Sequence, residues 1–488
     1  MNNAFFTDFP VWLPSALVKE LRQGLRTSSF TLMASVLPAA MALFFLFGFI
    51  PEPGTGGKPI VSQESITTVF WSFMVITLII CIPFRALSSV REELASRNSE
   101  LLLLTRQTSG RIILGKWTSF MAQALLMVFI ALPFALIRYY YGQVDLVQDV
   151  TFVVYLYLAC GVLTALYLWI SALPALLRVM FIAGLFFTGS SLLSLIFAMK
   201  GIHIMPFHDG FWPGLVRVAV ILTDCALVVS TMLILARRWF APAAENTAEP
   251  LRKILLGFYA VTLAILYAMG DSSSPVRETM VTHTVVLIFY SIFLMVVELA
   301  TPTMLLPVHV ERLRRKKLFH ISKFIFLPGM PGSVFFTMLM AALWGISQDA
   351  ANLIVPQPSP IFLTCLAVAA WYALTMPAMF LKPFWHRLKI NSLLAYLLVW
   401  GFIAFLLTMM TAGDLFLTLI PGSDFIHLIE TMDEASSREA FNILFCLMNL
   451  AAGFIVLNVT NREWFQTLKT DETDNAADRA DAPGPEQP

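Results

Sequence analysis

The residues that could carry out chemistry in this chain are few, and none has the spacing of a common catalytic or nucleotide-binding motif. A nucleotide-binding loop needs the pattern GxxxxGK[ST], in which backbone N–H groups surround the phosphates. The nearest match, Gly54–Lys58, has Glu52 in place of the leading glycine. His203, His208 and Asp209 lack the spacing of a helical or zinc-finger metal site, and the sequence contains no HExxH or GxSxG motif. We therefore expect no catalytic residue, no metal site and no cofactor bound by this chain itself.

Two acidic residues, Asp224 and Glu298, lie well inside apolar stretches of the sequence. A carboxylate inside a membrane is energetically costly, so such residues are candidates for function. A proton-coupled or sodium-coupled carrier could use both. The alternative is that each forms hydrogen bonds with a neighbouring helix. No basic residues are paired with them in the sequence, which favours the structural interpretation.

The most charged segment between two apolar stretches is Arg91–Trp117. Its first part, Arg91–Leu104, contains helix-forming residues throughout, and Arg97 is spaced to pair with a glutamate on either side. The run Leu101–Leu104 is far shorter than the roughly 20 apolar residues that cross a bilayer. These leucines must therefore be buried against a partner protein or the bilayer interface. The pattern predicts a cytoplasmic loop that carries a short surface helix.

The composition places the chain among membrane proteins. Of its 488 residues, 58% are hydrophobic and only 13% are charged, whereas a soluble protein has about 25% charged residues. All five cysteines lie in apolar stretches without CxxC spacing, so no disulfide framework is predicted. We expect an all-α polytopic membrane protein with no nucleic-acid partner.

Apolar stretches long enough to cross a membrane recur along the whole sequence, and each predicts one transmembrane helix. We expect about twelve, at residues 28–50, 67–85, 112–137, 151–173, 175–199, 214–236, 254–270, 284–305, 326–346, 360–381, 393–412 and 441–459. The polar, proline-containing linker Arg237–Lys253 divides them into two sets of six. The predicted divisions are an N-terminal segment 1–15, a first six-span unit 16–240, a second unit 241–469 and a disordered acidic tail 470–488.

The distribution of Lys and Arg predicts which side of the membrane each loop occupies. With the N-terminus in the cytoplasm, 26 of the 32 basic residues fall in cytoplasmic loops and termini. Such an excess follows the positive-inside rule. Both termini are therefore expected in the cytoplasm, and the protein in the inner (plasma) membrane.

The residues before the first span form an amphipathic helical pattern. One face is apolar, and the other is polar, with Lys19, Glu20, Arg22 and Arg26 as the charged residues. This pattern is typical of a helix that lies in the membrane interface in contact with lipid. We expect such an interfacial helix directly before the first span.

The order of elements in the 91–117 segment resembles the cytoplasmic loop of ABC-2 type transporter permeases. In that family an Arg-Glu-rich helix is followed by Glu-Leu-Leu-Leu and, after a short turn, by Ile-Leu-Gly-Lys. The corresponding residues here are Arg91-Glu92-Glu93, Glu100-Leu101-Leu102-Leu103 and Ile113-Leu114-Gly115-Lys116. The stretch Lys19–Arg26 also resembles the elbow helix that precedes the first span in these permeases. The resemblance covers about residues 16–240.

The resemblance implies that residues 91–104 form a coupling helix seated in a cleft of a separate ATPase subunit, which would bind ATP and Mg. The residues that would contact this partner are Arg91, Glu92, Glu93, Arg97, Glu100, Leu101 and Leu102. The alternative is an ordinary positively charged cytoplasmic loop. The ABC-2 resemblance favours the coupling helix.

The role of the second half depends on how the complex is assembled. Its loop Glu311–Lys323 occupies the place of the coupling loop but lacks the Glu-Leu-Leu-Leu and Gly-Lys elements. If this half is a diverged second permease unit, one chain suffices for two ATPases. If it is an accessory domain, two copies must form a homodimer through their first halves. The missing elements favour the homodimer.

Three classes of function fit the sequence. The first is a membrane-spanning permease subunit of an ABC transporter, which moves its substrate with ATP hydrolysed by a separate subunit. The second is a secondary, ion-coupled transporter, which would need binding residues at the membrane midplane and a clear internal repeat. The third is a polytopic membrane enzyme, which would need clustered polar residues at one depth. The elbow-like and coupling-like segments favour the permease.

Overall fold

The structure is a computed structural model that describes mainly the helical parts of the chain. It describes residues 15–48, 63–95, 108–141, 146–173, 211–241, 245–269, 305–314, 325–329 and 331–333, with residues 175, 178, 179, 182, 290, 294, 335, 336, 339, 340, 343, 462 and 466.

Every regular element in this described part is helical, which confirms the all-α prediction there. Five of the helices are long and apolar enough to cross a membrane, at residues 28–47, 65–91, 109–139, 146–171 and 218–237. They coincide with five of the first six predicted spans. The remaining one, residues 175–199, lies almost wholly outside the described residues. The total of twelve and the orientation of the termini stay predictions.

The chain divides into two compact units, Met1–Ala241 and Pro242–Pro488. The first unit contains α1 (Ser15–Leu25), α2 (Ser28–Gly48), α3 (Gln63–Val75), the π-helical segment η1 (Ile76–Cys81), α4 (Ile82–Ala95), α6 (Ser109–Tyr141), α7 (Leu146–Ser171) and α9 (Phe211–Arg237). The second contains α10 (Ala248–Met269) and α12 (Pro307–Arg314).

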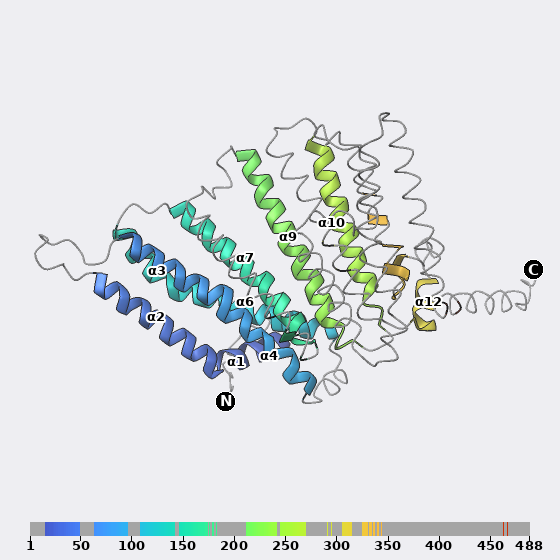
Figure 1. The fold of residues 1–488 in the computed structure, drawn as a ribbon, viewed down its shortest axis with the longest axis horizontal. Coiled ribbons are helices and arrows are strands. Elements are labelled where there is room, and N and C mark those ends of the chain that lie inside the picture. Colours follow the sequence, from blue (N-terminus) through green and yellow to red (C-terminus); the bar gives the residue numbers. More distant parts are fainter. Residues whose placement is uncertain are drawn as a thin grey trace, which may run out of the picture. The chain divides into compact units, whose positions relative to one another are not determined.

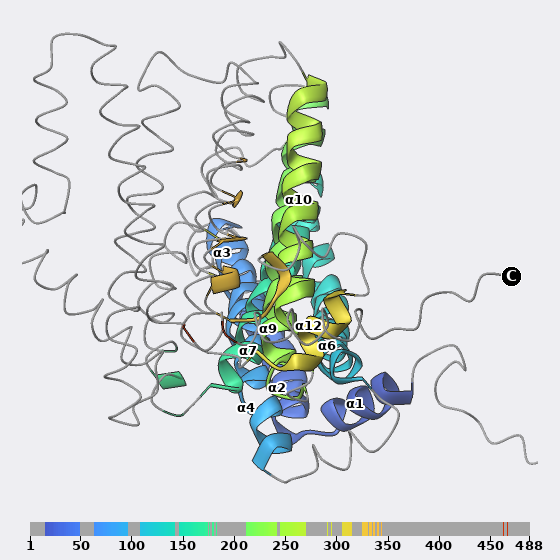
Figure 2. The same ribbon diagram turned by 90° about the vertical axis from the view of Figure 1, so that its right-hand side faces the viewer.

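The long helices of the first unit run side by side, and α1 lies across one end of them (Figures 1 and 2). Helix α1 contacts both α2 and α6. The change of direction between α1 and α2 occurs at Arg26 and Thr27. There the Thr27 hydroxyl donates to the Gly24 carbonyl at 2.7 Å, and the Thr27 carbonyl accepts from the backbone N–H of Phe30 at 3.1 Å. This turn gives the first unit its elbow.

The second span is one continuous helix that runs from Gln63 to Ala95 through α3, η1 and α4. The sequence predicted that this span ends near residue 85 and that a separate surface helix begins at Arg91, but residues 86–95 continue the same helix. No glycine or proline interrupts residues 84–95, so nothing stops the helix there. The wide π turn lies directly before Pro83, whose ring would clash with a carbonyl of a regular α-helix.

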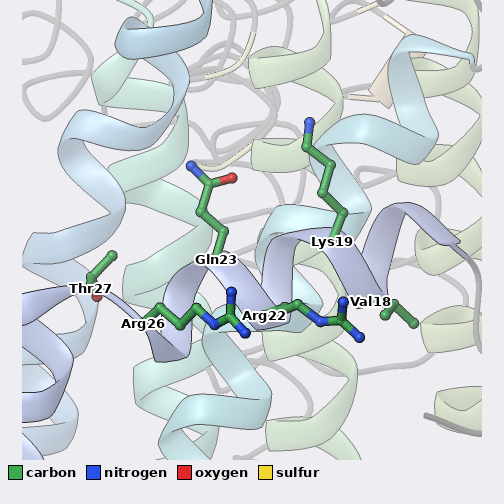
Figure 3. Close-up of a pocket in the computed structure, with 6 residues that line it drawn as sticks. All are labelled: Val18, Lys19, Arg22, Gln23, Arg26 and Thr27. Atoms are coloured by element: carbon green, nitrogen blue, oxygen red, sulfur yellow. The ribbon is translucent and has the colours of Figure 1, made fainter. Parts of the chain in front are cut away.

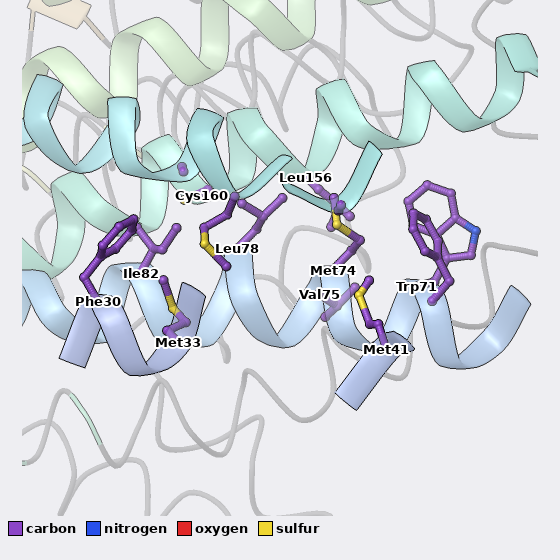
Figure 4. Packing of buried hydrophobic residues seen from close by; sticks show 14 of the residues in the cluster. Phe30, Met33, Met41, Trp71, Met74, Val75, Leu78, Ile82, Leu156 and Cys160 are labelled. Atoms are coloured by element: carbon purple, nitrogen blue, oxygen red, sulfur yellow. The ribbon is translucent and has the colours of Figure 1, made fainter. Parts of the chain in front are cut away.

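The core of the first unit follows this continuous helix along its length. Figure 4 shows Phe30, Met33 and Ile82 toward one end of the cluster and Trp71 toward the other, with Leu156 and Cys160 of α7 packed above. At 0% exposure, Leu78 of the π segment lies at the centre of this packing. Burying these apolar side chains fixes the positions of α2, α3, α6 and α7 relative to one another.

In the second unit the start of α10 is bound to the segment Ile325–Ser333. The Asn246 side chain caps α10 by accepting from the N–H groups of Ala248 and Glu249, and donates to the Phe326 carbonyl at 2.9 Å. Arg252, which is 1% exposed, donates to the Ile325 and Leu327 carbonyls at 2.5 and 2.9 Å.

Candidate functional site

The candidate site of the first unit is the region where α1 meets the first turns of α2, the α4 helix and the first half of α6. We call it the elbow junction and define it by Glu20, Gly24, Thr27, Arg85, Lys116 and Gln123. Helices α4 and α6 lead from it to the two ends of the 96–107 segment, since α4 ends at Ala95 and α6 begins at Ser109.

Arg85 of α4 makes most of the hydrogen bonds in the elbow junction. Its Nη1 donates to Gln123 Oε1 at 2.5 Å. Its Nη2 donates to Thr27 Oγ1 at 2.7 Å and to the Gly24 carbonyl at 3.2 Å, and its Nε donates to Ser29 Oγ at 3.2 Å. One guanidinium therefore links the second span to the elbow and to the third span.

The face of the Arg85 guanidinium is covered by an aromatic ring. Its Cζ lies 5.3 Å from the centroid of the Phe30 ring, within the range of a cation–π contact. The edge and one face of the guanidinium are thus both occupied, as expected for a partly buried cation.

Gly24 allows α1 to approach α6 closely. A Cβ atom at this position would clash with the Gln123 side-chain amide. A larger residue would therefore require the Gln123 amide, which accepts from Arg85, to move from its position.

An ion pair forms a second link between α1 and α6. Lys116 Nζ lies 3.1 Å from Glu20 Oε2, and the two side chains are 5% and 17% exposed. At this degree of burial, water screens the attraction less than at an open surface. Among the charged residues predicted for the elbow helix, Glu20 thus points toward α6.

Three basic residues lie on α1 and in the turn that follows it. Lys19, Arg22 and Arg26 are exposed, and together with Gln23 they line an open pocket of about 700 Å³ beside α1 (Figure 3). A row of cations on a helix that lies across the ends of apolar helices is suited to anionic lipid head groups.

Both ends of the 96–107 segment are also bound to other helices of the first unit. At the α4 end, the backbone N–H of Arg91 donates to Ser171 Oγ of α7 at 3.3 Å. At the α6 end, Arg237 Nε of α9 donates to Ser109 Oγ at 3.0 Å. A displacement of either end would therefore reach α7 and α9.

The structure places only some of the residues that the sequence singled out. Arg91 is exposed near the end of α4, and Glu92 and Glu93 follow it on the same helix. Asp224 is half-buried in α9. Four residues of the predicted coupling segment and the second membrane acid lie outside the described residues: Arg97, Glu100, Leu101, Leu102 and Glu298.

Sequence reasoning missed Arg85, Gln123 and the partner of Lys116. Arg85 was counted only as a cytoplasmic loop charge, and Gln123 was treated as part of an apolar span. The available signal was a polar residue inside an apolar helix, because such a residue needs a hydrogen-bonding partner there. Within the described residues, no group of three or more His, Cys, Asp or Glu could hold a metal ion.

The elbow junction can transmit movement, but its side chains do not form a nucleophile–base pair. It is a set of hydrogen bonds and one ion pair among four helices. Comparison of the chain with protein-family models, with curated proteins and with solved structures finds no match in any of the three.

Proposed function

We propose that this protein is a multi-pass permease subunit of an ABC transporter in the plasma membrane, and that a separate ATPase subunit powers it. The observation that carries this proposal is the elbow junction. Helix α4 leads into the 96–107 segment and α6 leads out of it, and Arg85 and Lys116 bind these two helices to α1. A force applied to the segment therefore acts on the elbow and on three membrane helices together.

Two further observations support the proposal. Helix α1 lies across the ends of the long helices with its basic side chains exposed, as the ABC-2 resemblance implies for an elbow helix (Figure 2). The second span contains the π segment Ile76–Cys81 between the elbow junction and the far end of the unit. Such segments are frequent at functional positions in helices that must change shape.

The proposal is tested by isolating the full chain from its native membranes and identifying what co-purifies. We expect a protein that carries a GxxxxGK[ST] loop and hydrolyses ATP. Reversing the charges of Glu92, Glu93 and Glu100 together should abolish this co-purification while membrane insertion stays normal.

The matched control reverses three charges elsewhere on the same face of the membrane, at Lys19 and Arg22 of α1 and at Arg26 in the turn that follows it. This variant should keep the ATPase. Loss of the ATPase in the control but not in the glutamate variant would remove the coupling role from residues 91–104.

A further inference from the structure

The end of the first unit opposite to α1 contains a pocket between the second, third and fourth spans. Its volume is about 490 Å³, and its lining includes Trp71 of α3, Ala135 and Arg138 of α6, and Asp149 and Val150 of α7. Nearly all other lining residues are apolar. Ligand pockets are typically about 300–1,000 Å³ and mostly apolar with a few polar groups, so the size and composition fit a small molecule.

The polar end of this pocket is formed by a buried cation that has only part of its hydrogen bonds. Arg138 is 1% exposed, and its Nη2 forms an ion pair with Asp149 Oδ2. Its Nε and Nη1 are buried and have no hydrogen-bond partner. A guanidinium has five N–H donors, so one carboxylate oxygen leaves most of them unused.

Two aromatic rings also lie close to the Arg138 guanidinium. Its Cζ lies 4.7 Å from the Phe70 ring centroid and 5.1 Å from that of Trp71. Asp149 lies in the first turn of α7, where the helix dipole also stabilises its negative charge. Asp149 therefore balances the charge of Arg138 but leaves its Nε and Nη1 donors without acceptors.

The depth of the pocket fits a molecule that lies in a lipid bilayer. Arg138 follows Lys116 by 22 positions on α6, which at 1.5 Å per residue is about 33 Å along the helix. This length matches the hydrocarbon core of about 30 Å, so Arg138 lies near the interface opposite to α1. The apolar lining then extends from that interface toward the midplane. Exposed Leu132, Leu136 and Val150 form the open side of the pocket.

We propose that this pocket binds one alkyl chain of an amphipathic molecule whose oxyanion head accepts hydrogen bonds from Nε and Nη1 of Arg138. The chain occupies the apolar lining beside Trp71, and the head lies at the interface. A carboxylate of a free fatty acid and a phosphate of a membrane phospholipid share this chemistry. The site does not depend on whether the protein is a permease subunit.

The test measures quenching of Trp71 fluorescence by brominated amphiphiles added to the full chain in lipid nanodiscs. Subtracting the signal of the Trp71→Phe variant isolates this tryptophan from the others. A brominated fatty acid should quench at a concentration roughly 2- to 10-fold lower than its methyl ester, the factor expected for one gained hydrogen bond. Brominated phosphatidylglycerol is compared in the same way with brominated diacylglycerol, which lacks the phosphate.

Two kinds of variant test the binding of the oxyanion head and of the alkyl chain separately. Arg138→Gln should remove the preference for the acid over the ester. Because this variant could misfold, Ala135→Phe provides a second test: it fills the pocket without changing the ion pair, and should abolish quenching by both probes. Leu125→Phe introduces the same side chain at an exposed position of α6 outside the pocket and should keep the quenching.

A preference for the fatty acid, for phosphatidylglycerol or for both supports the site and identifies the source of the oxyanion. Equal quenching by acid and ester in the unchanged protein overturns it. Quenching that persists in the Ala135→Phe variant also overturns the proposal. Disulfide formation between two chains through Val150→Cys, with no acid preference, would show instead that a second copy covers this face.

Discussion

The Arg85 guanidinium lies 2.5 Å from the side-chain oxygen of Gln123, although the two residues are 38 positions apart in the chain. This contact joins the second span to the third at the level of the elbow. The same guanidinium also binds the elbow turn, so three segments of the first unit depend on one side chain.

The first prediction concerns this side chain. Replacing Arg85 with Lys keeps the charge but removes the planar arrangement of donors, so it cannot reach Gln123, Thr27 and Ser29 together. Each lost hydrogen bond to a charged group contributes about 1.5–3 kcal/mol. We expect the free energy of unfolding to fall by about 2 kcal/mol or more, measured as a lower thermal midpoint in detergent.

The control for Arg85→Lys is Arg111→Lys, because Arg111 is exposed at the start of α6. A surface substitution of this kind changes stability by no more than about 0.5 kcal/mol. Equal thermal midpoints for the two variants would show that the Arg85 hydrogen bonds do not stabilise the elbow junction.

The second prediction concerns the ion pair between Glu20 and Lys116. Reversing either charge alone places two like charges side by side at a largely buried position. We expect both Glu20→Lys and Lys116→Glu to lower the thermal midpoint. The double variant restores the opposite charges and should recover part of the loss, giving a coupling energy of about 0.5–3 kcal/mol. Additive losses would indicate that the pair contributes no stability.

The span helices of the first unit could be predicted from sequence because apolarity over about 20 residues is a local property. The predicted stretches 28–50 and 112–137 and the helices found there agree to within a few residues. The helix of the second span was predicted to end too early, near residue 85. Charged residues mark where a chain leaves the membrane, but they are good helix formers, so charge alone does not end a helix.

The elbow junction could not be predicted because its partners are distant in sequence. A helical pattern shows that Arg85 lies on one face of its helix, but not which neighbouring helix that face contacts. Its actual partners, Gln123 and Thr27, are separated from it by 38 and 58 positions. The Arg138–Asp149 pair was missed for a related reason. Arg138 was counted only as one of the six basic residues outside the cytoplasmic loops, whereas it is buried against Phe70 and Trp71.

The third prediction concerns topology. In a chain whose five native cysteines are replaced, single cysteines at Thr55, Ser273 or Ser436 should react with an impermeant thiol reagent added outside intact cells. Cysteines at Ser96 or Glu245 should not. The reason is the excess of Lys and Arg in the loops assigned to the cytoplasm. Labelling at Glu245 from outside would contradict the twelve-span arrangement at its centre.

The fourth prediction concerns Arg252 in the second unit. Arg252→Lys should lower the thermal midpoint of the protein, since one ammonium cannot reach Ile325, Leu327 and Ser333 together. Gly332→Ala should do the same, because its Cβ would contact the Leu327 carbonyl and lie 2.7 Å from Arg252 Nη1.

The control for Arg252→Lys and Gly332→Ala is Lys253→Ala, which changes the residue next to Arg252. Lys253 is 54% exposed, and it forms an ion pair with Glu249 one helical turn earlier. Exposed pairs at this spacing contribute about 0.3–0.5 kcal/mol. A loss in Lys253→Ala as large as that in Arg252→Lys would show that Arg252 does not hold the 325–333 segment.

The last prediction concerns stoichiometry. In the first unit, Glu20 precedes the first span and binds Lys116 at the start of the third. In the second unit, Asn246 precedes the seventh predicted span and binds the Phe326 carbonyl at the start of the ninth. In each unit, the segment before the first span is thus joined to the start of the third span. The link is an ion pair in the first unit and a hydrogen bond in the second.

This correspondence favours a diverged second permease unit over the accessory domain and homodimer that the sequence favoured. In the second unit, α12 and the basic residues that follow it occupy the place of the coupling segment. We therefore expect one permease chain per two ATPase chains, measured as the mass of the detergent-solubilised complex. Neutralising the basic cluster should then weaken ATPase binding, and its members are Arg312, Arg314, Arg315, Lys316 and Lys317. Two permease chains in the complex, with ATPase binding unaffected by the neutralised cluster, would establish the homodimer instead. In that case the cluster would contact anionic lipid, to which each charge contributes about 1 kcal/mol.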